Sequence, residues 1–164
     1  MKVDLRPLFT ADTGAIPLDL TFDLSGLDVS GGYPLCEPVR FTGGVYNRAG
    51  VVTLEGEISA VYSAPCDRCG KETNAPVCCH VTYVLTEAMA GEERDDYWVV
   101  PDRVLDMDEV VLTELFPALP SKHLCSPDCK GLCPVCGADR NVADCGCSDR
   151  KDNPFADALA NFFD

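Results

Sequence analysis

Six of the eleven cysteines in this 164-residue chain crowd into its last third, with the spacing Cys-x3-Cys-x3-Cys-x2-Cys-x8-Cys-x-Cys. At the centre of this run is Cys133-Pro134-Val135-Cys136-Gly137, a Cys-x-x-Cys-Gly turn that aims two sulfurs at one point. Four thiolates placed in this way suit tetrahedral zinc, with zinc–sulfur bonds of about 2.3 Å. The sequence therefore predicts a structural zinc site whose candidate ligands are Cys125, Cys129, Cys133, Cys136, Cys145 and Cys147.

The spacing leaves the ligand set open beyond Cys133 and Cys136. If one zinc binds, its second pair is either Cys145 with Cys147 or Cys125 with Cys129, whereas two zinc ions that share thiolates would use all six. The intervening residues 138–144 are polar and cannot fold by burying apolar surface. Metal binding would supply the missing folding free energy, on the order of 10 kcal/mol in small zinc peptides.

A second Cys-x-x-Cys-Gly turn, at Cys66 and Cys69, has no neighbouring cysteine pair. These two residues are free thiols, a redox pair, or half of a metal site that another part of the fold completes. Cys78 and Cys79 are adjacent in a predicted strand, so they point to opposite faces, and we expect both to be buried.

Neither histidine suggests catalysis. His80 lies in the middle of a predicted strand and is expected to be structural, while His123 precedes the cysteine run and is either structural or an outlying ligand. The chain has no Gly-x-Ser-x-Gly motif and no glycine-rich phosphate loop. We therefore expect a protein that is not an enzyme.

The start of the chain meets charged residues at once, and no stretch approaches the roughly 18 apolar residues that a membrane span requires. We expect a cytoplasmic protein without a membrane partner. In a reducing cytosol, clustered cysteines indicate metal binding rather than disulfides.

The charge is strongly acidic, with 27 acidic and 13 basic residues and a formal net charge of −14. Residues 1–121 carry most of it, with 20 acidic and 8 basic residues, whereas residues 122–151 are close to neutral. Broad nucleic-acid binding rests on Lys and Arg neutralising phosphates, so this charge argues against a DNA-binding protein. It favours a basic protein partner, with direct RNA contact open only at the cysteine-rich module.

Strands must position these cysteines, because alternating apolar residues dominate the first half of the chain. Pro17 belongs at the start of its strand or in an edge strand. Gly43-Gly44 is expected to interrupt another strand, and residues 47–50 form a hairpin turn. The predicted strands are residues 16–24, 39–46, 51–62 and 77–85. They suit a curled or barrel-like antiparallel sheet.

Two short helices are predicted beside this sheet. The first begins at Asp106, with Glu109 completing a capping box, and ends at Pro117 and Pro120. The second begins at Asn153. The fold class is therefore α+β, mainly antiparallel β, with one domain over residues 1–121 and a zinc-binding module with a short C-terminal helix over residues 122–164.

Several motifs together resemble one bacterial family, the YceD-type large ribosomal RNA subunit accumulation proteins, in its cysteine-rich branch. The residues that carry the resemblance are Cys66-Asp67-Arg68-Cys69, Leu119-Pro120, the run from Leu124 to Gly137, Cys145-Gly146-Cys147 and Asn153-Pro154-Phe155-Ala156. The resemblance implies a noncatalytic ribosome biogenesis factor that supports accumulation of large-subunit ribosomal RNA. Its expected partner is a basic ribosomal protein or the immature large ribosomal subunit.

Two alternatives remain open at this point. The clustered cysteines also suit a zinc-thiol redox switch, in which oxidation ejects zinc, or a zinc-dependent regulatory binding protein.

Overall fold

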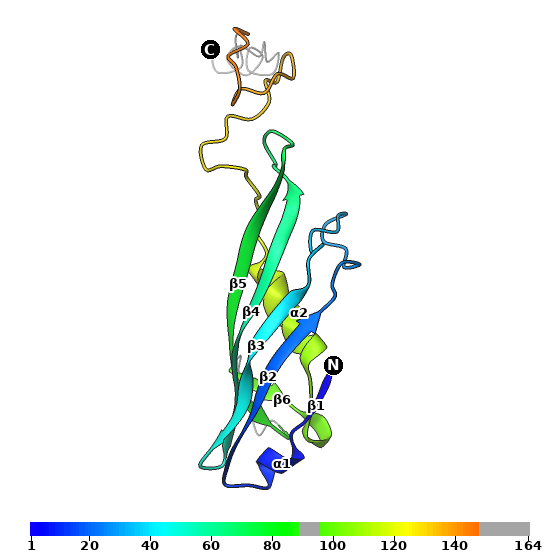
Figure 1. The fold of residues 1–164 in the computed structure, drawn as a ribbon, viewed down its shortest axis with the longest axis vertical. Coiled ribbons are helices and arrows are strands. Elements are labelled where there is room, and N and C mark those ends of the chain that lie inside the picture. Colours follow the sequence, from blue (N-terminus) through cyan, green and yellow to red (C-terminus); the bar gives the residue numbers. More distant parts are fainter. Residues whose placement is uncertain (89–95, 148–164) are drawn as a thin grey trace, which may run out of the picture.

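The computed structural model describes residues 1–88 and 96–147. Its main element is a five-stranded sheet that curls into a half-barrel, with strand order β2-β3-β4-β5-β6 (Figure 1). The strands are β2 (Thr13–Phe22), β3 (Val39–Arg48), β4 (Val51–Pro65), β5 (Glu72–Thr86) and β6 (Tyr97–Val99). β2 to β5 are antiparallel and β6 pairs in parallel with β5, so the predicted fold class is confirmed. Pro17 lies inside β2, which is an edge strand, so of the two expected positions the edge is the one found.

The core lies between the inner face of this sheet and the helix α2 (Met107–Ala118). Inner-face positions alternate with exposed ones along each strand, so Phe41, Leu54 and Val81 are buried while their chain neighbours face outward. The helix contributes Val111 and Leu115 to the same apolar cluster. This packing needs no metal.

The expected interruption of β3 at Gly43-Gly44 is wrong, because β3 runs through both glycines. Gly43 pairs with Gly56 of β4, and a Cβ atom on Gly43 would lie 2.2 Å from the carbonyl oxygen of Glu55. A Cβ atom on Gly56 would lie 2.5 Å from the Phe41 ring. The glycines are present because side chains would not fit, and not because the strand ends there.

The predicted hairpin turn between β3 and β4 is confirmed. Ala49 and Gly50 both have positive φ, of 55° and 85°, which is the conformation of a two-residue hairpin loop. Asn47 is buried, accepts a hydrogen bond from Gly50 N at its Oδ1, and donates from Nδ2 to Leu8 O and Ala11 O. It therefore connects the hairpin to the N-terminal residues.

The N-terminus forms elements that the sequence pattern did not indicate. A strand β1 (Lys2–Asp4) pairs with β7 (Val104–Asp106), and a short helix α1 (Arg6–Phe9) follows β1. A 3-10 turn, η1 (Pro101–Arg103), precedes β7.

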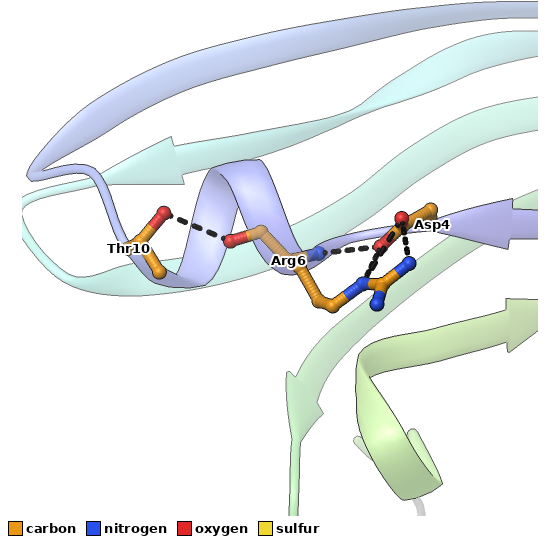
Figure 2. Close-up of polar contacts among 3 residues, drawn as sticks. All are labelled: Asp4, Arg6 and Thr10. Carbon is orange, nitrogen blue, oxygen red and sulfur yellow. Dashed lines mark hydrogen bonds and ion pairs between the residues drawn. The ribbon is translucent and has the colours of Figure 1, made fainter.

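Three polar residues join β1 to α1 (Figure 2). The Asp4 carboxylate accepts hydrogen bonds from the backbone N–H and the guanidinium of Arg6, and Thr10 donates from its hydroxyl to Arg6 O. The side-chain hydrogen bonds from Arg6 lower the pKa of Asp4 to about 2.

Asp106 is the N-cap of helix α2, as predicted. Its side chain accepts a hydrogen bond from Asp108 N, one position earlier than the Glu109 N of the expected capping box. Pro117 lies inside its last turn instead of ending it. The helix stops at Ala118 because Leu119, which precedes Pro120, is extended. The helix predicted at Asn153 lies outside the described residues, and no helix within the described part of the chain has the length and apolarity to cross a membrane.

The long β4–β5 hairpin carries the Cys66–Cys69 turn to the opposite end of the sheet from α1 (Figure 1). After α2 the chain returns to this same end, where it forms residues 122–147 without helix or strand. The fold thus brings the two cysteine-bearing parts of the sequence together.

Candidate metal centres

Both Cys-x-x-Cys-Gly motifs fold into the same turn. In the first, Cys66 N donates to Lys71 O at 2.9 Å, and Gly70 N donates to Cys66 O at 2.8 Å. In the second, Cys133 N donates to Ala138 O at 2.8 Å, and Gly137 N donates to Cys133 O at 2.9 Å. The two glycines have φ of 71° and 75°, a conformation that side chains rarely adopt, so the glycine is part of the motif.

The structure sorts eight cysteines into two groups of four, and no sulfur is shared between them. Within each group the four sulfurs lie within 4.8 Å of one another. The first cluster comprises Cys66, Cys69, Cys125 and Cys129. The second cluster comprises Cys133, Cys136, Cys145 and Cys147.

This arrangement separates the alternatives that spacing left open. Cys133 and Cys136 lie with Cys145 and Cys147, which was one of the two pairings considered. Cys125 and Cys129 lie instead with the distant Cys66–Cys69 turn, so that turn is half of a group completed from elsewhere in the fold. The first cluster draws residues from both sides of the boundary predicted at residue 121, and the division into domains stays a prediction.

The distances between sulfurs suit a bound metal. The Sγ atoms of Cys66 and Cys129 are 3.8 Å apart, and those of Cys69 and Cys125 are 3.6 Å apart. Ligands at about 2.3 Å from a tetrahedral ion lie about 3.8 Å from each other. A disulfide would require about 2.05 Å, and all eleven cysteines are free thiols. Each cluster could therefore hold one metal ion.

The two clusters differ in their access to solvent. In the first, Cys66 and Cys129 are only 3% and 2% exposed. In the second, Cys133 is buried but Cys136 is exposed. Cys69 and Cys125 of the first cluster and Cys145 and Cys147 of the second are partly buried. The first cluster is thus the more deeply buried of the two, because it has no exposed ligand.

Backbone hydrogen bonds lower the pKa of one thiol in each cluster and so favour its thiolate form. A hydrogen bond from the Cys125 backbone lowers the pKa of Cys66 to about 6, and one from the Cys136 backbone lowers the pKa of Cys133 to about 6. The pKa values of Cys69, Cys125, Cys145 and Cys147 are raised instead. Hydrogen bonding with Cys129 and Cys69 raises the pKa of Cys125 to about 12. A bound dication would counteract this rise and let all four ligands ionise.

Contacts outside the sulfurs also hold the returning segment on the hairpin tip. Asp67 N donates to His123 O at 2.9 Å, and His123 N donates to the Asp67 carboxylate at 2.7 Å. Arg68 donates from Nη1 to Cys129 O at 2.6 Å and accepts from Leu132 N at its carbonyl. The residues between the first two cysteines therefore recognise the segment that carries the other two.

The remaining candidate residues lie outside both clusters. His123 is buried, its Nε2 lies 3.0 Å from Thr73 O, and its ring contacts the Tyr62 ring edge-on, which is a structural role. The His80 side chain is 83% exposed on the outer face of the sheet. Cys78 is exposed as well and Cys79 is partly buried, so the expectation that both are buried is wrong for Cys78 and only partly met by Cys79.

Sequence reasoning named all eight clustered cysteines but missed the pairing of Cys66 and Cys69 with Cys125 and Cys129. One signal could have suggested it: the two Cys-x-x-Cys-Gly motifs have the same form, and each needs a second pair. With Cys145 and Cys147 assigned to the nearer motif, Cys125 and Cys129 remain for the other.

A family comparison covers this whole cysteine-bearing region. The family model described as large ribosomal RNA subunit accumulation protein YceD matches residues 54–163, a stretch that includes both clusters.

Individual relatives agree with this match. The chain is 24% identical over 182 aligned residues to a protein of Zea mays named large ribosomal RNA subunit accumulation protein YCED homolog 1, chloroplastic, with 92% of this chain and 62% of the maize protein covered. It is 32% identical over 94 residues to an uncharacterized protein of Mycobacterium tuberculosis, with 52% and 44% covered. The chain thus spans less than two thirds of these relatives' lengths. No solved structure matches it significantly.

Proposed function

Because the chain belongs to the YceD family of large ribosomal RNA subunit accumulation proteins, we propose that it is a noncatalytic factor in biogenesis of the large ribosomal subunit. The observation that carries this proposal is the family match over residues 54–163, which includes both cysteine clusters. The names of the plant relatives support the same role in ribosomal RNA accumulation.

Zinc is the metal that we assign to both clusters. Four cysteine ligands at tetrahedral spacing are typical of structural zinc, and they leave no open coordination position for substrate or water. The first cluster would fasten the segment after α2 to the β4–β5 hairpin, and the second would fold residues 133–147 around its own ion. A closed tetrathiolate centre supports a structural rather than a catalytic role for the metal.

The charge of the loaded protein supports a basic protein partner. The formal charge of −14 counts every thiol as neutral, and zinc with four thiolates carries −2, so two loaded centres bring the formal charge to about −18. The cysteine-bearing end then ceases to be a near-neutral region suited to RNA. A ribosomal protein, bound alone or on the immature large subunit, is the partner that this field attracts.

A redox switch remains the second candidate, and the exposure of Cys136 is the observation that favours it. Oxidation by a peroxide would begin at an accessible ligand and release the zinc of the second cluster. Zinc content that stays unchanged after mild peroxide treatment would remove this candidate.

Density-gradient profiles of ribosomes test the main proposal. Cells that lack the protein should accumulate immature large subunits and less large-subunit ribosomal RNA, and the protein should sediment with those particles in wild-type cells. An unchanged gradient and a protein that stays at the top of it would contradict the role.

The partner is tested separately. Ribosomal RNA fragments should not shift in a gel at physiological salt, while a basic large-subunit protein should bind with an affinity that falls as salt increases. Tight RNA binding without any protein would contradict the proposed partner but leave the role in biogenesis standing.

A further inference from the structure

Asn141 lies in the chain segment between ligands of the second cluster, but its side chain contacts the first cluster. It lies between Cys136 and Cys145, yet its Nδ2 is 3.4 Å from the Cys129 sulfur, a hydrogen-bonding distance for an amide and a thiolate. Its Oδ1 accepts a hydrogen bond from Lys130 N at 2.7 Å. One side-chain amide therefore touches both a ligand atom of the first cluster and the backbone next to that ligand.

The orientation of this amide is determined by its neighbours. Lys130 N can only donate, so the amide oxygen must face it, and the amide nitrogen must then face Cys129 and Asp139. Asn141 N also donates to the Asp139 carboxylate at 2.9 Å, which holds the loop in place. The donor is thus aimed at the Cys129 sulfur.

The loop around Asn141 also runs against the first cluster through its backbone. Arg140 N donates to Gly131 O at 3.0 Å, and Leu132 forms an isolated antiparallel bridge with Asp139. The residues between the two ligand pairs of the second cluster therefore lie beside the segment that leaves Cys129.

The two clusters differ in what must come together to form them. All four ligands of the second cluster lie within residues 133–147, so the chain closes only a short loop around the ion. In the first cluster Cys69 and Cys125 are 56 positions apart, and longer loops cost more entropy to close. The first cluster therefore gains more from a residue that holds one of its ligands in position.

We propose that Asn141 couples the two metal centres: metal in the second cluster orders the Asn141 loop, and the Nδ2–H to sulfur contact then raises the metal affinity of the first cluster. This inference rests on metal binding at both clusters, as proposed above. Outer hydrogen bonds to metal ligands commonly contribute 10–100-fold in affinity. By linkage, metal in the first cluster must strengthen the second by the same factor.

The test uses the full-length chain with cadmium-113 as the probe, because its NMR signal reports each tetrathiolate site separately. The Cys66→Ser and Cys145→Ser variants assign the two signals. Competition with a chelator then gives the affinity of each site. Asn141→Ala should lower the affinity of the first cluster 10–100-fold. The matched control is Asn74→Ala, an exposed asparagine in β5 outside both clusters, which should change neither affinity.

Two further variants separate coupling from general damage to the loop. Asn141→Asp keeps an oxygen for Lys130 N but replaces the donor with a negative charge beside the sulfur, so its loss should exceed that of Asn141→Ala. In a chain whose first cluster is disabled by Cys66→Ser, Asn141→Ala should leave the affinity of the second cluster unchanged, because the residue then has no metal ligand to act on.

The outcomes are distinct. The coupling would be overturned if wild type and Asn141→Ala both bound two ions and each cluster had the same affinity in the two proteins. The coupling would also be overturned if Asn141→Ala, made in the Cys66→Ser background, lowered the metal affinity of the second cluster as much as it lowers that of the first cluster in the otherwise wild-type chain. That result would mean that Asn141 only holds the loop of the second cluster in shape. A wild-type chain that binds fewer than two ions contradicts the proposed metal centres themselves.

Discussion

The sulfurs of Cys66 and Cys129 lie 3.8 Å apart although 63 positions separate the two residues. One belongs to the tip of the β4–β5 hairpin and the other to the chain that returns after α2. Both are almost fully buried, so this contact is the centre of the joint between the sheet and the cysteine-rich segment. What happens to this joint when ligands or metal are removed can be measured.

Replacing Cys66 with serine should remove one metal ion and leave the other. The second cluster contains no residue from the hairpin, so it should keep its ion, and metal analysis by mass spectrometry should fall from two ions per chain to one. Cys36→Ser, at an exposed cysteine outside both clusters, should retain two. A loss of both ions in Cys66→Ser would mean that the clusters do not bind independently enough to be counted as two sites.

Chelation of both metals should loosen residues 122–147 but leave the sheet folded. The apolar core between the sheet and α2 includes no clustered cysteine, so burial there continues to stabilise strands β2 to β5. Trypsin should cut faster after Lys122 and Lys130 in the chelated protein, while the far-ultraviolet circular dichroism of the sheet persists. Cooperative loss of the whole β signal on chelation would show instead that the metals hold the entire fold.

Gly131→Ala should destabilise the joint without touching a ligand. Gly131 has φ of 71°, and a Cβ atom there would lie 2.9 Å from Arg68 O, so alanine meets both backbone strain and a close contact. A left-handed conformation at a residue other than glycine costs roughly 1–3 kcal/mol. The measurement is the free energy of unfolding of the metal-loaded protein in denaturant.

Gly26→Ala is the matched control for that experiment, because a Cβ atom on Gly26 would have nothing within 4 Å. It should unfold like wild type. Equal stability of the Gly131 and Gly26 variants would show that the approach of Gly131 to Arg68 is not required.

The pairing of Asp4 with Arg6 should be visible in an acid titration. The hydrogen bonds from Arg6 lower the pKa of Asp4 from 3.8 to about 2 in the folded protein. The stabilisation from this pair is therefore fully present above about pH 4 and is lost as the pH falls towards 2, where the folded carboxylate protonates. The carboxyl carbon of Asp4, followed by NMR, should titrate near pH 2, and Arg6→Gln should move its midpoint back towards 3.8. An unchanged midpoint in Arg6→Gln would assign the shift to another group.

Local patterns determined much of this protein. Alternation along residues 16–24, 51–62 and 77–85 predicted strands that overlap β2, β4 and β5, together with their buried faces, because successive side chains in a strand point to opposite sides of a sheet. The Cys-x-x-Cys-Gly spacing determined both turns, because their hydrogen bonds join residues at most five positions apart and need only a glycine that accepts positive φ.

Tertiary structure decided what those local elements meet. Gly43 by itself predicts a break in the strand, and only the approach of Glu55 and Gly56 in the neighbouring strand β4 explains why a glycine continues β3. The sequence likewise could not identify the partners of Cys66 and Cys69. All thiols are the same kind of ligand, and spacing along the chain suggests partners only among cysteines that are close in sequence. The long hairpin and the returning chain select Cys125 and Cys129, since they alone bring those sulfurs to the tip where Asp67 and Arg68 hold the segment.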